Sequence, residues 1–298
     1  MGISRSCFRL LCKLKSENGF GESVLQLGRQ SAMFNLKTLK KSAIRHGLNP
    51  LTFEKSKNWD IYKNIATDKE IFMQLGFQNI RSIDISPYEN SDIIHDLNNP
   101  VPSSLYNSQD LIFDGGTTEH VFDTLKVLAN LHTMLKNNGI IIHYTPANNH
   151  VNHGFYQFSP SFYMDYYREN NYEIVESFLV RSFKALNRTN LVYQYDSVIF
   201  ENLAFGGWGR AMLGNWFVVK KNSNSTSGKI PQQNRYERIF WRNTEESSSH
   251  NNSFRSKIVL HLQKLPKIRY FLIQIRRILK TIWFVNRPNI LPKPYFRI

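Results

Sequence analysis

The sequence predicts an α/β domain with a mostly parallel β-sheet, followed by a basic helical tail at its C-terminal end. The domain is predicted by short apolar, strand-like segments that alternate with helix-like segments from about residue 20 to residue 221. Such alternation is typical of βαβ units, in which helices cover a parallel sheet. The tail is predicted by its charge, because residues 255–298 contain five Lys, six Arg and no acidic residue. These residues carry +11 of the formal net charge of +15.

The composition is typical of a globular protein. The 298 residues are 41% hydrophobic, which suits one domain of about 200 residues with appendages. No apolar run reaches the roughly eighteen residues of a transmembrane helix. Two cysteines, Cys7 and Cys12, support neither a disulfide framework nor a zinc site. Basic residues interrupt the N-terminal apolar segment, so no signal peptide is predicted and a cytoplasmic location is expected.

The first half of the domain begins, after an N-terminal extension of residues 1–19, with a strand and a glycine turn. The segment VLQLGRQ at 24–30 has an apolar run that Gly28 breaks, which predicts a buried strand and a tight turn. Thr67, with a glutamate three residues later, forms a capping box and predicts the start of a short helix. Between these signals, the sequence predicts a basic helix at about 31–45 and an insertion at about 46–66.

The second half of the domain continues the alternation. Apolar residues at helical spacing predict a helix at 118–136, which Gly139 helps to stop. Ser159 and Pro160 place a capping hydroxyl before a proline, which predicts another helix start. The remaining segments are strand-like: 79–86, 110–114, 140–145, 172–180 and 215–221. The domain is expected to end near residue 221, and the polar stretch 222–254 is expected to be a linker to the tail.

Candidate ligand-binding residues follow the predicted strands. In a parallel sheet, ligands bind beyond the carboxyl ends of the strands, where the winding reverses. Asp84 ends its strand and suits a ribose, because one carboxylate can accept hydrogen bonds from two hydroxyls. Asp96 precedes an apolar residue, Leu97, and suits an adenine ring with its exocyclic amine. Gly115 and Gly116 would let the backbone approach a ligand closely.

The order of these pieces resembles that of the class I S-adenosylmethionine-dependent methyltransferases, in particular the branch that acts on small molecules. The resemblance covers residues 20–221 and depends on five segments: VLQLGRQ, SIDIS, IHDLNNP, DLIFDGGTTEHV and LKNNGIIIHYTP. It implies a Rossmann-like, mostly parallel, seven-stranded sheet flanked by helices. It also implies S-adenosyl-L-methionine as the cofactor and methyl transfer as the activity.

The resemblance implies roles for single residues at the adenosine end of the cofactor. Gly28 would let the chain pass close to the methionine part, and Asp84 would hold the ribose. Ile85 would pack on the adenine, which Asp96 and Leu97 would flank.

At the methionine end, the resemblance implies that the backbone of Asp114 and Gly115 lines the site. The first loop departs here from the family's acid-x-Gly-x-Gly pattern, because Gln26 replaces the acid and Gln30 replaces the second glycine. Gln26 can still accept a hydrogen bond from the cofactor's ammonium group, but a charge-assisted bond would be about twice as strong. A non-catalytic protein on the same fold is therefore an alternative.

Residues 148–167 form the polar and aromatic segment expected beside the acceptor. They include His150 and His153, either of which could take a proton from an acceptor oxygen, since histidine titrates near neutral pH. The resemblance places His120 on the acceptor side as a third candidate. A hydrogen-bonded loop with an aromatic plug is the alternative interpretation. His143, inside an apolar strand, is expected to be a core residue, and no cluster with metal-ligand spacing is recognised, so no metal is expected.

The spacing of apolar residues over 265–285 predicts a basic amphipathic helix within the tail. Six apolar residues at spacings of three and four form one stripe: Leu265, Ile268, Leu272, Ile275, Leu279 and Ile282. Such a helix could attach to the anionic inner face of a membrane or contact nucleic acid. It could also pack on the domain or on a second copy of the chain, since its spacing allows a homo-oligomer.

The sequence thus predicts methyl transfer to a small or glycan-like hydroxylated acceptor, at or near a membrane surface. Such an activity would suit polysaccharide or glycolipid assembly. Two alternatives remain open, a non-catalytic binding or scaffold protein and a methyltransferase that binds RNA through its tail. Enzymes of the family that methylate amino groups of nucleic-acid bases usually have an Asn/Asp-Pro-Pro-aromatic segment after the fourth strand. This sequence has none there, which argues against that chemistry.

Overall fold

The computed structural model of the chain describes residues 2–53, 65–182, 190–203, 207–234, 274–275 and 294–297. The chain falls into two compact units. The first unit contains Met1–Asp196, Arg210–Pro231 and Lys293–Ile298. The second contains Ser197–Gly209 and Gln232–Pro292, and its described part includes a short 3-10 helix, η4 (Ile199–Leu203). The other helices and strands below all belong to the first unit.

The first unit is built on a sheet whose strands, as far as the structure describes them, follow the order β3-β2-β1-β4-β5-β8-β6-β7-β9. The strands are β1 (Ser23–Leu27), β2 (Asn79–Asp84), β3 (Ile93–Ile94), β4 (Gln109–Asp114), β5 (Leu135–Asn148), β6 (Glu173–Ser182), β7 (Leu191–Gln194), β8 (Met212–Lys220) and β9 (Phe296–Arg297). Strands β1 to β5 pair in parallel, in the 3-2-1-4-5 order of nucleotide-binding sheets. β8 runs antiparallel between β5 and β6. The predicted α/β fold with a mostly parallel sheet is confirmed. The described sheet has nine strands instead of the expected seven, because β7 and β9 extend it beyond β6.

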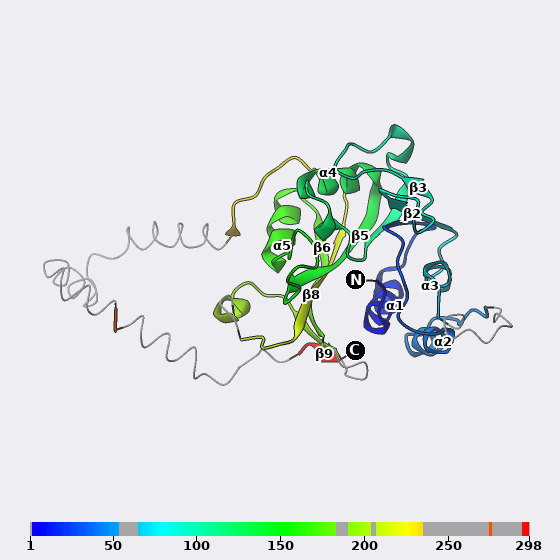
Figure 1. Cartoon of the computed structure of the whole chain (residues 1–298), viewed down its shortest axis with the longest axis horizontal. Helices are drawn as coiled ribbons and strands as arrows, with labels where there is room; N and C mark the ends of the chain where they lie inside the picture. Colours follow the sequence, from blue (N-terminus) through cyan, green and yellow to red (C-terminus); the bar gives the residue numbers. More distant parts are fainter. Residues whose placement is uncertain are drawn as a thin grey trace, which may run out of the picture. The chain divides into compact units, whose positions relative to one another are not determined.

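Helices cover both faces of this sheet (Figure 1). On one face lie α1 (Arg5–Asn18), α2 (Leu36–Arg45) and α3 (Asp68–Gln74). On the other face lie α4 (Thr124–Met134) and α5 (Pro160–Glu169). Successive side chains of a strand point to opposite faces, so each inner strand contributes to two cores. Val24, Leu111 and Phe113 pack with the first set of helices, while their neighbours Leu25 and Ile112 pack with the second.

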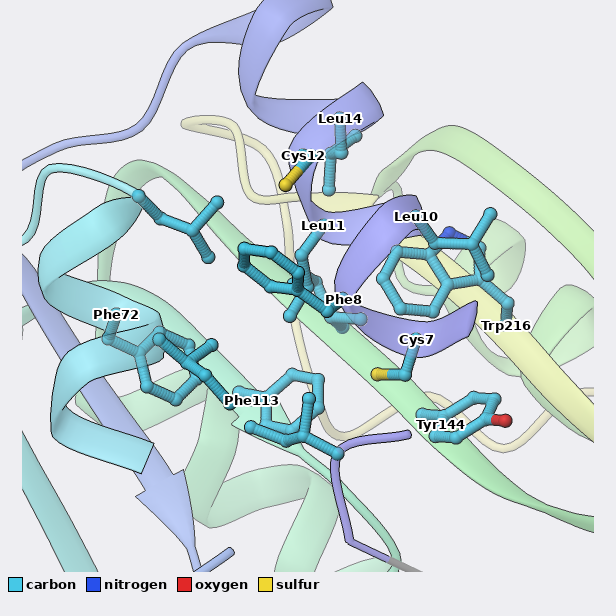
Figure 2. Packing of buried hydrophobic residues seen from close by; sticks show 14 of the residues in the cluster. Cys7, Phe8, Leu10, Leu11, Cys12, Leu14, Phe72, Phe113, Tyr144 and Trp216 are labelled. Atoms are coloured by element: carbon cyan, nitrogen blue, oxygen red, sulfur yellow. The ribbon is translucent and has the colours of Figure 1, made fainter. Parts of the chain in front are cut away.

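Helix α1 lies within the predicted N-terminal extension and is part of the core (Figure 2). Six of its side chains have no exposed surface: Cys7, Phe8, Leu10, Leu11, Cys12 and Leu14. Figure 2 shows them next to Phe113 and Trp216 of the sheet and Phe72 of α3. Ser4 caps the helix by accepting a hydrogen bond from the Cys7 amide at 3.1 Å. The basic residues that interrupt this segment in the sequence therefore lie on the outer side of an amphipathic helix.

The expected helix over 118–136 is divided in two. Its first residues form a 3-10 turn, η3 (Thr118–His120), because the Asp114 side chain accepts hydrogen bonds from the amides of Thr117 (3.0 Å) and Thr118 (3.2 Å). Asp123 then caps α4 by accepting from the Lys126 amide at 2.9 Å. The helix ends at Met134 and β5 begins at once, so the expected stop at Gly139 falls inside a strand.

Three predicted segments lie only partly within the described residues. The predicted insertion is described as far as Phe53, and there Gln74 of α3 bonds the Leu51 amide (2.8 Å) and the Asn49 carbonyl (2.9 Å). The predicted linker is described as far as Asn234. The predicted tail helix at 265–285 lies outside the described residues except for positions 274 and 275. Among the described residues, no helix has both the length and the apolar character needed to span a membrane.

Candidate functional site

A cavity of about 520 Å³ lies beyond the carboxyl ends of β1 and β2, at the edge where the winding of the sheet reverses. Its volume is in the range of ligand pockets, roughly 300–1,000 Å³. Six of the residues predicted for the site line it: Gly28, Asp84, Ile85, Asp96, Leu97 and His120. The structure thus brings together the glycine turn, the acid that ends β2 and the Asp96 segment. Gln26, Asp114, Gly115, His150 and His153 are not among its lining residues.

The Gly28 turn passes close to two polar side chains. Its φ of +66° lies in the left-handed region, and a Cβ there would come within 2.9 Å of Thr117 Oγ1 and 3.5 Å of Asp84 Oδ2. The turn is held by its own amide, which donates to the Ile83 carbonyl at 2.8 Å. The Thr117 hydroxyl donates to the Leu27 carbonyl at 2.6 Å. Because glycine alone fits this conformation and space, the backbone can face the cavity beside Asp84.

The adenine side of the expected site is a tight turn. Asp96 Oδ1 accepts hydrogen bonds from the Asn98 amide (2.9 Å) and side chain (2.8 Å). These bonds hold the pKa of Asp96 below its usual value, and the bond from the Asn98 amide has the largest effect. Leu97 is 5% exposed and belongs to the core, whereas Ile85 is 67% exposed at the rim. One apolar wall and one ionised acceptor therefore meet at this end of the cavity.

Gln30 occupies the space beside the first loop where the family pattern would have a glycine. Its Nε2 donates to the Leu27 carbonyl at 2.8 Å, and a Cβ added to Gly115 would lie 2.4 Å from its Oε1. The side chain is 7% exposed. It therefore fills the gap between the Gly28 turn and the end of β4, which is where the resemblance places the methionine end of a cofactor.

Gln26 is hydrogen-bonded to an acid, Asp68, that no sequence pattern predicts for the site. Its Nε2 donates to Asp68 Oδ2 at 2.9 Å, and the same oxygen lies 3.0 Å from Arg29 Nε. Asp68 is 5% exposed, at the start of α3, and Arg29 lines the cavity. A carboxylate thus stands next to the position where the family pattern has its acid, but it is supplied by another element and is neutralised by Arg29.

Asp114 stabilises the site from inside the core. Its Oδ2 lies 2.8 Å from His143 Nδ1 and accepts from the Thr118 hydroxyl at 2.7 Å, and His143 Nε2 lies 2.7 Å from the Tyr167 hydroxyl. Burial raises the pKa of Asp114, but its hydrogen bonds with His143, Thr118 and Thr117 outweigh burial and hold that pKa below its usual value. His143 is fully buried with both ring nitrogens bonded, as the sequence predicts.

A second polar cluster, Glu119, His120 and His153, borders the cavity through His120. Glu119 has no exposed surface, and its Oε1 lies 3.5 Å from His153 Nε2 and 3.9 Å from His120 Nε2. Among the described residues, no other residue donates a hydrogen bond to either carboxylate oxygen. Burial, followed by the charge of Asp114, raises the pKa of Glu119 to about 8. In the sequence, the only signal for a role of Glu119 is that it directly precedes His120.

The loop that carries His150 and His153 is hydrogen-bonded to the η3 turn. The amides of Phe155 and Tyr156 donate to the Glu119 carbonyl at 2.8 and 3.2 Å. A Cβ at Gly154 would lie 2.8 Å from that same carbonyl oxygen, so only glycine permits this approach. The ring centroids of His120 and His153 are 5.0 Å apart, and those of His150 and His153 are 5.8 Å apart. His120 and His153 therefore lie beside Glu119, and His150 lies next to His153.

No protein-family model matches the chain, and neither does any curated protein. The fold is similar to several solved methyltransferases. A 1,6-didemethyltoxoflavin-N1-methyltransferase of Burkholderia thailandensis, solved with S-adenosylhomocysteine, is 12% identical (TM-score 0.38; 72% of this chain and 78% of that chain). A putative methyltransferase of Bacillus halodurans C-125 is 9% identical (TM-score 0.39; 73% and 100%). The methyltransferase CalH, also solved with S-adenosylhomocysteine, is 12% identical (TM-score 0.35). The matched region covers 73% of this chain but only 55% of CalH. At such scores the likeness says nothing about the chemistry of this chain.

Proposed function

We propose that the chain is an S-adenosyl-L-methionine-dependent methyltransferase that acts on a small or glycan-like hydroxylated acceptor. The observation that carries this proposal is the convergence of Gly28, Asp84 and Asp96 on one cavity at the point where the sheet reverses. A nucleoside needs a close backbone approach, a carboxylate for its ribose and an apolar slot with an acceptor for its base. These three residues and Leu97 supply those features in one place.

The chain's own side chains would divide the work of the reaction. When bound, the cofactor would supply an electrophilic methyl group on a sulfonium, and its transfer to the acceptor oxygen would leave the electron pair on sulfur. Asp84 would fix the ribose and so the direction of the methyl group, since in-line displacement depends on positioning. The proton of the acceptor hydroxyl must leave. His120, which lines the cavity, or its neighbours His153 and His150 would accept it.

Calorimetric titration of the full chain with S-adenosylhomocysteine tests the cofactor. We expect saturable binding that Asp84→Asn weakens about 10- to 100-fold, because a hydrogen bond to a charged group contributes about 1.5–3 kcal/mol. Glu169→Gln is the matched control, because it removes one negative charge from an exposed position at the end of α5. Absence of binding by the wild-type chain, or equal losses in the two variants, would contradict the proposal.

The non-catalytic alternative is favoured by one observation, the Gln30 side chain in the gap beside Gly115. If this side chain only swings aside for the cofactor, Gln30→Gly should tighten binding of S-adenosylhomocysteine. If the chain has lost the cofactor, the wild type should not bind it, and Gln26→Glu with Gln30→Gly should create binding. A wild type that binds and a Gln30→Gly variant that binds more tightly would exclude a chain that has lost the cofactor.

We also propose that the basic tail holds the enzyme at an anionic membrane surface, where glycolipid or polysaccharide precursors would be the acceptors. Each basic residue near such a surface contributes about 1 kcal/mol. Deleting residues 255–298 would also remove β9, which pairs with β7, so substitution of Arg269, Arg276, Arg277 and Lys280 by Gln is the cleaner test. Loss of sedimentation with anionic but not neutral liposomes is expected. The RNA-binding alternative predicts a different result: the wild type would retain RNA and would not bind liposomes, and the four substitutions would abolish the RNA retention.

A further inference from the structure

We propose that Glu119, His120 and His153 form a binding site for a divalent first-row transition-metal cation. Each residue offers one ligand atom, and these atoms all lie within 4.8 Å of one another. An ion with bonds of about 2.0–2.2 Å holds its ligand atoms roughly 3.0–3.5 Å apart. The Glu119 Oε1 to His153 Nε2 distance of 3.5 Å and the Glu119 Oε1 to His120 Nε2 distance of 3.9 Å need only small side-chain movements to reach that range.

The carboxylate of Glu119 is the main reason to expect a ligand here. Its side chain is completely buried, yet no other described residue donates a hydrogen bond to it. A buried polar group without a partner is rare and costly, so each case calls for an unseen water, an ion or a functional role. In the described contacts of Glu119 Oε1, the neighbouring side-chain nitrogens are the Nε2 atoms of two imidazoles, His120 and His153. A cation between the three groups would satisfy the carboxylate and use both rings as ligands.

The surrounding backbone is arranged to hold these ligands in place. His120 and Glu119 are fixed by the η3 turn, which Asp114 holds from the core through the amides of Thr117 and Thr118. The loop of His153 is tied to the same turn by two hydrogen bonds to the Glu119 carbonyl, with Gly154 allowing the contact. A Cβ at Gly154 would also lie 3.1 Å from His120 Nδ1, so this ring turns its Nε2, not its Nδ1, toward Glu119.

The ligand set indicates the class of metal. Two imidazole nitrogens and one carboxylate oxygen suit Zn²⁺, Mn²⁺ or Fe²⁺, and this combination with open positions is a known arrangement for divalent first-row metals. Mg²⁺ and Ca²⁺ prefer sites built from oxygen atoms. Three protein ligands leave at least one position for water or for a substrate oxygen. His120 also lines the cavity, so the site borders the place where an acceptor would lie.

The metal would change the roles of the predicted catalytic histidines. A ligand ring cannot also accept the acceptor's proton at the same nitrogen, so His120 and His153 would hold the ion instead. If the proposed function is correct, a bound cation would lower the pKa of a coordinated hydroxyl and deliver it as the nucleophile. The released proton would pass to water or to His150, whose ring centroid is 5.8 Å from that of His153. This role depends on the proposed function, whereas the metal site itself does not.

Metal binding by the full chain, stripped with a chelator, tests the site without any assay of activity. We expect one Zn²⁺ per chain by competition with a chromogenic chelator, weaker Mn²⁺ and at least about 100-fold weaker Mg²⁺. Glu119→Gln, His120→Gln and His153→Gln should each weaken Zn²⁺ by at least about 100-fold, since even partners outside the ligand shell are worth 10- to 100-fold. His150→Gln, the neighbouring histidine outside the trio, should change it less than about threefold. Co²⁺ should give visible absorption bands that the three variants remove.

Several results would overturn the proposal. One is the absence of stoichiometric metal, and another is Zn²⁺ binding that survives in any of the three ligand variants or falls equally with His150→Gln. Circular dichroism and thermal unfolding of each variant without metal show whether it has folded. If Glu119→Gln does not fold, the two partly exposed histidines decide the outcome by themselves. Titration with S-adenosylhomocysteine separates the two proposals. A chain that binds S-adenosylhomocysteine but no metal contradicts only the metal site, and a chain that binds metal but no S-adenosylhomocysteine contradicts only the proposed function.

Discussion

Gln26 on β1 donates a hydrogen bond to Asp68 at the start of α3, with Nε2 and Oδ2 2.9 Å apart. The two residues are 42 positions apart in the sequence. The carboxylate that the first loop lacks is therefore supplied from a different element, and Arg29 shares it at 3.0 Å. This arrangement links the cavity wall to the helix that follows the insertion.

The Arg29–Asp68 pair should stabilise the first loop. Asp68 is nearly buried and Arg29 about one-fifth exposed, so Asp68→Asn leaves a partly buried cation without its main partner. We expect Asp68→Asn to lower the free energy of unfolding by about 1–3 kcal/mol. Urea unfolding of Asp68→Asn, Arg29→Met and the double variant gives the coupling. A coupling of zero would show that the pair contributes nothing.

Gly28 should be required both for its backbone conformation and for the space around it. Gly28→Ala should cost about 1–2 kcal/mol for the left-handed backbone, and more because its Cβ would meet Thr117 Oγ1 at 2.9 Å. Gly47 is the control, since its φ is +73° but nothing lies within 4 Å of an added Cβ. Thermal unfolding should therefore show a larger loss for Gly28→Ala than for Gly47→Ala. Equal losses would mean that Thr117 simply moves away.

His132 should make the fold sensitive to acid. Burial, followed by the charge of Lys221, lowers the pKa of His132 to about 4, against about 6.5 in an unfolded chain. Between these values the unfolded state binds more protons, so stability falls as pH drops from about 6.5 to 4. Partial exposure limits the loss to about 1–2 kcal/mol. Urea midpoints measured over this range should depend less on pH in His132→Gln, and an unchanged slope would contradict the prediction.

Helix α1 should be essential to the fold. Phe8 has no exposed surface, and its ring stacks on Phe34 with centroids 5.4 Å apart. Phe8→Ala should lower the free energy of unfolding by about 3–5 kcal/mol, because it removes buried area and leaves a cavity. Tyr88→Ala, at a residue that is 89% exposed, should change it by less than about 0.5 kcal/mol. Similar urea midpoints for the two variants would mean that α1 does not contribute to the cooperative unit.

Much of the fold could be predicted because its signals are local. The capping box of Thr67 and Glu70 forms as expected, with bonds of 3.1 and 2.7 Å. The alternation of strands and helices predicts the parallel part of the sheet, and that part places Gly28 and Asp84 at one edge. The signal for the N-terminal helix is weaker, because its basic residues interrupt the apolar run and only the period of 3.6 residues places them on one side of a helix. The break at His120 was missed, since it depends on a side chain from β4.

The sequence by itself determined the α/β fold, the strand ends and the convergence of Gly28, Asp84 and Asp96, because periodicity and the rule for parallel sheets need no knowledge of distant contacts. Only the tertiary structure decided that Asp68 would partner Gln26, that Gln30 would fill the gap beside Gly115, and that His153 would lie next to Glu119. These pairs join residues from separate elements. Their contacts depend on how helices and loops pack on the sheet, and no local pattern in the chain encodes that packing.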